Sequence, residues 1–247
     1  WALSTSLILS VISRALMGTG SSFAYISLLK SIKMNFPTRQ FAFILSISEC
    51  LSFVGVAFAN TIASYYSSFF GWRYVIGGCS LISVLISLAI LFTFVDKKDQ
   101  ASRTGGKGSL TSFFDVTFRG NLIQLLSSSK IWIVGLYSGL SYSVVTVFVA
   151  LWAIPYYVKS QGLTGTEATS AVSMVYLGIA VSSPIVGWAT RRISIRNLIC
   201  VGTGLAVLFM TSSLYWVKSF HSIYIQLFFL GVSISVYQLS FAIVAGV

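Results

Sequence analysis

The sequence is poor in charged residues, which make up 9% of its 247 positions, with 16 Lys and Arg but only 5 Asp and Glu. Soluble domains carry about 25% charged residues. So few charges cannot cover a surface in water, which excludes a soluble globular protein and makes lipid the expected solvent. The formal net charge of +11 then indicates basic loops on one side of a membrane rather than nucleic-acid binding.

Residue types that supply enzymatic or metal chemistry are equally scarce. His221 is the one histidine, and no apolar segment holds two carboxylates. The three cysteines, Cys50, Cys79 and Cys200, lie in apolar runs, which excludes a disulfide framework. Residues 105–109 are rich in glycine but lack the spacing and the Lys-Ser/Thr pair of a P-loop. We therefore expect no enzymatic activity, no cofactor and no metal.

No cleavable signal pattern opens the sequence, which begins at Trp1 with no basic stretch and no small-residue cleavage site. This start indicates an internal fragment of a longer protein.

Long apolar segments fill most of the sequence, and each is long enough to cross about 30 Å of hydrocarbon as a helix. The short alternating segments of a strand barrel do not occur, and backbone in lipid must satisfy its own hydrogen bonds, which favours helices. We predict an all-α, polytopic transmembrane bundle. Its spans are 7–29, 41–63, 74–95, 131–157, 168–190, 198–217 and 223–247.

The basic residues predict the orientation of these spans. Of the 16 Lys and Arg, Arg14 lies within a span, three lie in the second, fourth and sixth loops, and the rest lie in the first, third and fifth. Basic loops stay in the cytoplasm, so the chain is predicted to begin outside and to end inside.

The third loop, 96–130, is the longest and divides the chain into segments 1–95 and 131–247. It begins polar and glycine-rich and becomes amphipathic from 110 to 126. An apolar stripe of this kind lies on a membrane face. We predict a cytoplasmic linker with an amphipathic helix.

Arg14 and Glu49 are the charged residues that lie well inside predicted spans. A charge at that depth costs about 2.5–3.5 kcal/mol, so each needs a partner or a wet cavity. Their predicted depths differ by roughly 8 Å. A structural charge pair and a role in substrate or proton handling both remain open.

Small and polar residues mark the later spans. Gly135, Gly139 and Gly187 belong to ladders of small residues at helical contact spacing, which is typical of closely packed membrane helices. Tyr137, Ser141 and Tyr142 in one span, and Tyr237 and Gln238 in another, either line a hydrophilic path or form interhelical hydrogen bonds.

Four features, in order along the chain, resemble the major facilitator superfamily. The stretch Arg14-Ala-Leu-Met-Gly18-Thr-Gly20 resembles an R-x-x-x-G-x-G signature of its fourth helix, and Gly71-Trp72-Arg73 resembles the loop between helices 5 and 6. The loop 96–130 resembles the linker between its six-helix halves. Residues 187–196 are similar to its G-x-x-x-D-R-x-G-R-R loop, with Arg191 in place of the acid. The chain would cover roughly helices 4 to 10, with 1–95 ending the first bundle and 131–247 beginning the second.

The resemblance implies a secondary transporter that moves a small polar organic solute by alternating access, coupled to a proton or another cation. It implies that Arg14 lies near the cavity, that Gly18 and Gly20 pack closely, and that Arg192 and Arg196 gate the cytoplasmic face. The absence of a Gly-Pro pair from 56–63 favours symport over drug antiport. The expected partners are a small-molecule substrate, a coupling ion and lipid, without nucleic acid, and the expected state is a monomer in a plasma membrane, the inner membrane of a bacterium.

The alternative function is a seven-helix receptor, which the number of spans and the outward N-terminus also fit. Against it, the last span has no Lys for a retinal Schiff base and the outer loops have no cysteines.

Overall fold

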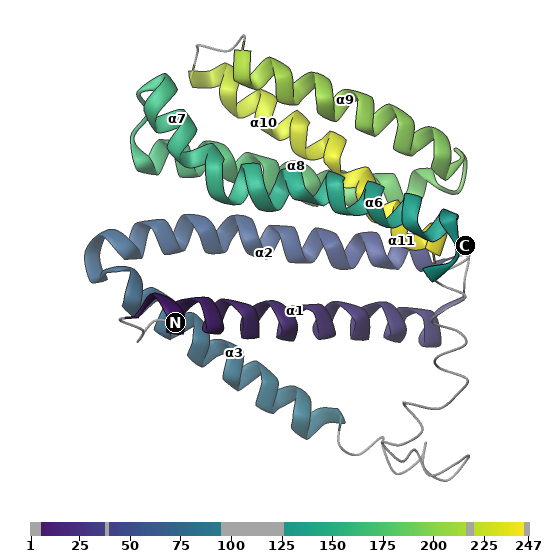
Figure 1. The fold of residues 1–247 in the computed structure, drawn as a ribbon, viewed down its shortest axis with the longest axis horizontal. Helices are drawn as coiled ribbons and strands as arrows, with labels where there is room; N and C mark the ends of the chain where they lie inside the picture. Colours follow the sequence, from purple (N-terminus) through teal and green to yellow (C-terminus); the bar gives the residue numbers. More distant parts are fainter. Residues whose placement is uncertain (1–5, 38–39, 95–125, 216–219, 245–247) are drawn as a thin grey trace.

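The computed structural model describes residues 6–37, 40–94, 126–215 and 220–244, and these contain helices and no strand. The elements, shown in Figure 1, are α1 (Leu7–Asn35), α2 (Phe41–Phe70), α3 (Trp72–Phe94), α6 (Ser129–Ser143), the π-helix η4 (Val144–Trp152), α7 (Ala153–Gln161), α8 (Gly165–Ala189), α9 (Ile195–Tyr215), α10 (Phe220–Ile234), the 3-10 helix η5 (Ser235–Gln238) and α11 (Leu239–Val244). The all-α prediction is confirmed.

In the part of the chain that the structure describes, seven helical stretches are long and apolar enough to cross a membrane. They coincide with the seven predicted spans, with ends displaced by a few residues. Two of them are composite: α6, η4 and α7 form Ser129–Gln161, and α10, η5 and α11 lie within His221–Val244. Most of the predicted linker, including nearly all of its amphipathic stretch, lies outside the described residues.

The helices form two groups, which we call the N-terminal group (α1 to α3) and the C-terminal group (α6 to α11). Figure 1 shows α2 running alongside α8, with α1 and α3 on one side and α10 and α9 on the other. The main core joins the two groups, because Phe53 and Ala57 of α2 pack with Val172 and Tyr176 of α8. This part of the interface between the groups is therefore apolar.

The two groups also meet at one end of the bundle, which we call the basic end. Here α1 ends, α2 begins, α8 ends and α9 begins, and Lys33, Arg191 and Arg196 lie nearby. Ile32, Phe41, Ala42, Leu45 and Ala242 form a second apolar cluster at this end. Ile32 is the residue of α1 that is buried, so most of α1 lies clear of the C-terminal group.

Glycine allows close helix contacts at particular positions. A Cβ atom added to Gly231 of α10 would meet the backbone of Val175, and one added to Gly178 of α8 would meet the backbone of Phe228. At Gly187 of α8 it would meet the Ser46 side chain of α2, with the Ser46 Cβ 2.7 Å away. The first two glycines join helices within the C-terminal group, and Gly187 joins the two groups.

The predicted packing role is not seen at Gly18, Gly20, Gly135 or Gly139, where an added Cβ would meet no described atom within 4 Å. Gly18 and Gly139 line a cavity, Gly135 and Gly139 line a second, smaller one, and Gly20 is exposed on α1. Spacing of small residues identifies a smooth helix face but does not tell whether a helix or a cavity lies against it.

Candidate functional site

Glu49 lies between the two groups and is 6% exposed. The hydroxyl of Tyr25, from α1, donates to its Oε1 at 3.0 Å. The hydroxyl of Tyr237, from η5, donates to its Oε2 at 3.3 Å. One carboxylate of α2 thus accepts a hydrogen bond from each group, and both of its described donors are neutral.

Aromatic rings surround this carboxylate. The ring of Tyr142, from α6, lies against that of Tyr237 with centroids 5.3 Å apart. Phe241 of α11 meets Tyr25 edge-to-face at 5.3 Å and Tyr237 edge-to-face at 6.3 Å. Edge-to-face packing is a favourable arrangement for aromatic pairs. The rings therefore hold one another in place around Glu49.

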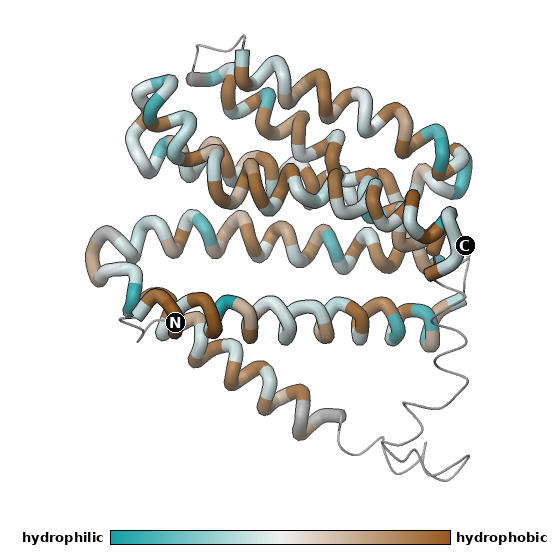
Figure 2. Tube along the Cα trace, in the orientation of Figure 1, coloured by the Kyte–Doolittle hydropathy of each residue, from teal (hydrophilic) through white to brown (hydrophobic). Residues whose placement is uncertain are grey.

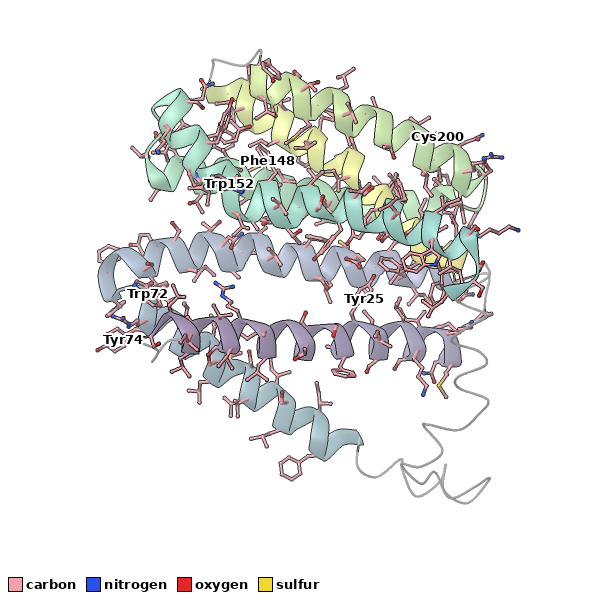
Figure 3. The ribbon with its side chains drawn as sticks, in the orientation of Figure 1. Tyr25, Trp72, Tyr74, Phe148, Trp152 and Cys200 are labelled. Carbon is pink, nitrogen blue, oxygen red and sulfur yellow. The ribbon has the colours of Figure 1, made fainter. Side chains whose placement is uncertain are left out.

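These side chains line a cavity of about 480 Å³, which is within the size range of small-molecule sites. Figure 3 labels Tyr25 between α1 and α2 at this place. The lining residues come from α1, α2, α6, η5 and α11; they are Gly18, Ser21, Ser22, Tyr25, Leu28, Glu49, Ser52, Phe53, Val56, Ser138, Gly139, Tyr142, Tyr237 and Phe241. Among these described residues there is one carboxylate and no Lys, Arg or His.

The wall that α1 contributes is polar for a membrane helix. Among the seven spans of the described chain α1 has the lowest mean hydropathy, 1.3, and Figure 2 shows a pale middle stretch in it. Gly18, Ser21, Ser22 and Tyr25 follow one another at intervals that keep them on one helix face. This face lines the cavity rather than contacting lipid.

The structure brings together some of the predicted site residues and separates others. Glu49 and Tyr142 line the cavity.

Tyr137 and Ser141 line a different groove of about 350 Å³, where the Thr203 hydroxyl donates to Tyr137 at 3.3 Å. Gln238 is 1% exposed, and its amide nitrogen is 3.5 Å from the Ser183 carbonyl. These three side chains lie within the C-terminal group and outside the cavity around Glu49.

Arg14 does not line the cavity. It is exposed on α1, eleven residues before Tyr25, which corresponds to about 16 Å along the helix axis. The hydrogen-bond partners of Glu49 that the structure describes are tyrosines. A role of Arg14 in substrate or proton handling stays a prediction.

The predicted gate residues differ in their contacts. The Arg192 guanidinium lies 5.5 Å from the ring centroid of Trp188, a residue of the preceding α8, and Arg196 is exposed at the start of α9. Arg191 instead reaches across to α2, with its guanidinium 5.0 Å from the ring centroid of Phe43. This cation–π contact links the two groups at the basic end. Arg191 occupies the position at which the G-x-x-x-D-R-x-G-R-R pattern has an acid.

Tyr25 is a residue of the candidate site that the sequence did not single out, whereas Tyr237 stood beside Gln238 among the polar residues of the last span. A signal was present for Tyr25, which follows the small residues Gly18, Ser21 and Ser22 on one helix face. The sequence did not indicate the partner of Tyr237, because Glu49 is 188 residues away in the chain.

A comparison with protein families matches residues 1–246 to the family described as Major Facilitator Superfamily. Comparisons with curated proteins and with solved structures gave no match. The family match covers nearly the whole chain and includes every residue of the cavity.

Proposed function

The chain belongs to the major facilitator superfamily, and on this premise we propose that it moves a small polar organic solute by alternating access, coupled to protons through Glu49. The family match confirms the resemblance and the membrane transporter that it implied, and it does not favour the receptor. The protein is integral to the membrane. We place it in a plasma membrane, where a proton gradient can drive transport.

The observation that carries this proposal is the position of Glu49. The hydroxyls of Tyr25, from the N-terminal group, and of Tyr237, from the C-terminal group, both donate hydrogen bonds to its carboxylate. Hydrogen bonds to an ionised carboxylate are roughly twice as strong as those between neutral groups. Protonation of Glu49 would weaken both bonds and add an O–H that needs an acceptor. A proton on this residue therefore changes the link between the two groups, which is what coupling requires.

The contacts at the basic end support alternating access. Beyond the cavity toward this end, the groups touch through the apolar cluster around Ile32 and Ala242 and through Arg191 on Phe43. Toward the opposite end, α1 buries no residue. The contacts that must separate for the cavity to open at the basic end are therefore this cluster, the Arg191–Phe43 contact and the close approach of Gly187 to Ser46. A rocking motion of two groups about a central site is typical of such transporters.

The coupling is tested with the full chain in proteoliposomes that contain the pH dye pyranine. Amines, sugars, carboxylates and zwitterions are added in turn, and the lumenal pH is recorded. We expect at least one solute class to move protons with the wild type, and Glu49→Gln to abolish that movement. Glu167→Gln is the matched control, because Glu167 lies outside the cavity at the start of α8. Proton movement that survives in Glu49→Gln would remove Glu49 from the coupling.

The motion is tested with spin labels at both ends, after replacement of the native cysteines. One pair is Lys30 and Ile243 at the basic end, and the other is Ile8 on α1 and Val158 on α7; all four residues are exposed. Electron–electron distance measurements at low and high pH should show the two distances changing in opposite directions. Distances that change in the same direction, or not at all, would contradict alternating access.

A further inference from the structure

We propose that the cavity takes an organic cation, a protonated amine or a quaternary ammonium, which binds at the Glu49 carboxylate in competition with the proton. The inference rests on the function proposed above and adds the class of the substrate. It also replaces symport by exchange, since a carboxylate that holds the cation does not hold the proton.

The charge of the cavity is the first argument. Among the described residues that line the cavity, Glu49 is the one carboxylate, and none is a Lys, Arg or His. A buried carboxylate without a cation is costly unless it is protonated or paired. The two tyrosines give it hydrogen bonds but no positive charge. An organic cation supplies the missing charge, whereas an anion in the same place would be repelled.

The direction of the hydroxyl hydrogens is the second argument. Ser22 donates to the Thr19 carbonyl at 2.7 Å, and Ser52 donates to the Ser48 carbonyl at 3.0 Å. Tyr25 and Tyr237 donate to Glu49. Each hydroxyl has one hydrogen and two lone pairs, so these four side chains present oxygen acceptors to the cavity. A ligand with N–H groups matches such a wall better than one with carboxylate or phosphate oxygens.

The aromatic rings are the third argument. Tyr25, Tyr142, Tyr237 and Phe241 form a cluster with centroids 5.3 to 6.3 Å apart, and Tyr142 is 43% exposed. A cation within about 6 Å of a ring centroid is attracted by the ring face, and aromatic clusters recognise quaternary ammonium groups in this way. Rings and a carboxylate together are complementary to a cation with apolar substituents.

The exchange of cation for proton follows from the identity of the titratable groups that face Glu49. These are Tyr25 from α1, Tyr142 from α6 and Tyr237 from η5. Cys50, next to it on α2, packs into the core, and Tyr176 of α8 stacks on Phe53. Glu49 is thus the group that can carry a proton in the acidic and neutral range. Loading the cation releases that proton, and loading the proton releases the cation.

Binding is tested on the purified full chain with two pairs of probes, choline with 3,3-dimethylbutan-1-ol and 2-phenylethylammonium with 2-phenylethanol. Each pair differs in charge at nearly constant shape. We expect at least one cation to bind about tenfold or more tightly than its neutral partner. Its affinity should fall by up to about tenfold per pH unit on acidification. Glu49→Gln should remove both effects, and Glu167→Gln should keep them.

The rings are tested separately by isothermal titration of the same probes. Tyr142→Leu should weaken the binding of the cation by about 2- to 30-fold and leave the neutral partner unchanged. Tyr142→Phe keeps the ring and should keep the affinity. No preference for charge in either pair, or equal effects of Leu and Phe on the cation, would overturn the proposal.

The vesicle assay separates this inference from the proposed function. With an acidic lumen, addition of the bound cation should make the lumen more alkaline, and acidification would show symport and refute exchange. Proton movement that depends on Glu49 but answers only to neutral or anionic solutes would refute the substrate class and leave the proposed function standing. No Glu49-dependent proton movement with any solute would refute both.

Discussion

Replacement of Gly231 by alanine should separate α8 from α10. An added Cβ would meet the Val175 carbonyl oxygen and lie 2.9 Å from its carbonyl carbon and 3.0 Å from its Cα. These are backbone atoms, so no side chain can rotate away, and the helices would have to move apart by about 1 Å to reach ordinary contact. Overpacking of this kind costs about 1–3 kcal/mol, which exceeds the gain of about 1 kcal/mol when alanine replaces glycine in a helix.

Gly135→Ala is the matched control, because Gly135 lies inside α6 and an added Cβ there meets no described atom within 4 Å. It should leave stability unchanged or raise it by up to about 1 kcal/mol. Thermal unfolding of both variants in detergent and in bicelles measures the difference. The double variant Gly178→Ala with Gly231→Ala should lose less stability than the sum of the two single variants. Both added methyl groups crowd the same contact between α8 and α10, and one outward shift of the helices accommodates both. A Gly231→Ala protein as stable as Gly135→Ala would refute the close contact.

Three other predictions concern the cavity, the basic end and the start of α8. Gly139→Leu should reduce transport in proteoliposomes and leave the midpoint of thermal unfolding nearly unchanged, because the new side chain enters the cavity; a large loss of stability would show that Gly139 faces a helix. Arg191→Ala should remove the contact with Phe43, worth about 0.5–1 kcal/mol, and lengthen the Lys30 to Ile243 distance, whereas Arg192→Ala should not; equal distances in the two variants would argue against the link. Thr164→Ala removes the capping box with Glu167 at the start of α8 and should destabilise the protein by about 1 kcal/mol, measured by thermal unfolding; an unchanged midpoint would show that the cap is not needed.

The spans were predictable from the sequence because lipid imposes a single rule on them. Each needs about 20 apolar residues in helical form, and the segments around Phe41 and Gly165 satisfy that rule without reference to their neighbours. The family was predictable for a related reason, since its signatures at Arg14 and at residues 187–196 are short and local. Glu49 was predictable as a candidate because a charge within an apolar run is visible in one dimension.

The pairing of these elements was decided by the tertiary structure. Spacing alone assigned Gly135, Gly139 and Gly187 to helix packing. Of these Gly187 makes a close contact, and the other close contacts lie at Gly178 and Gly231. The sequence favoured Arg192 over Arg191, but whether a guanidinium reaches another helix depends on where that helix begins.

The cavity shows most clearly what the sequence determined and what the tertiary structure decided. The sequence by itself determined that a carboxylate would lie within the membrane and that it would need a partner there. Tyr25, Glu49 and Tyr237 come together because α1, α2 and η5 converge, and the fold brings η5 to α2 by packing α2 along α8. Hydrogen bonds act over about 3 Å, whereas Glu49 and Tyr237 are 188 residues apart, so contacts between distant helices decide which residues meet the charge.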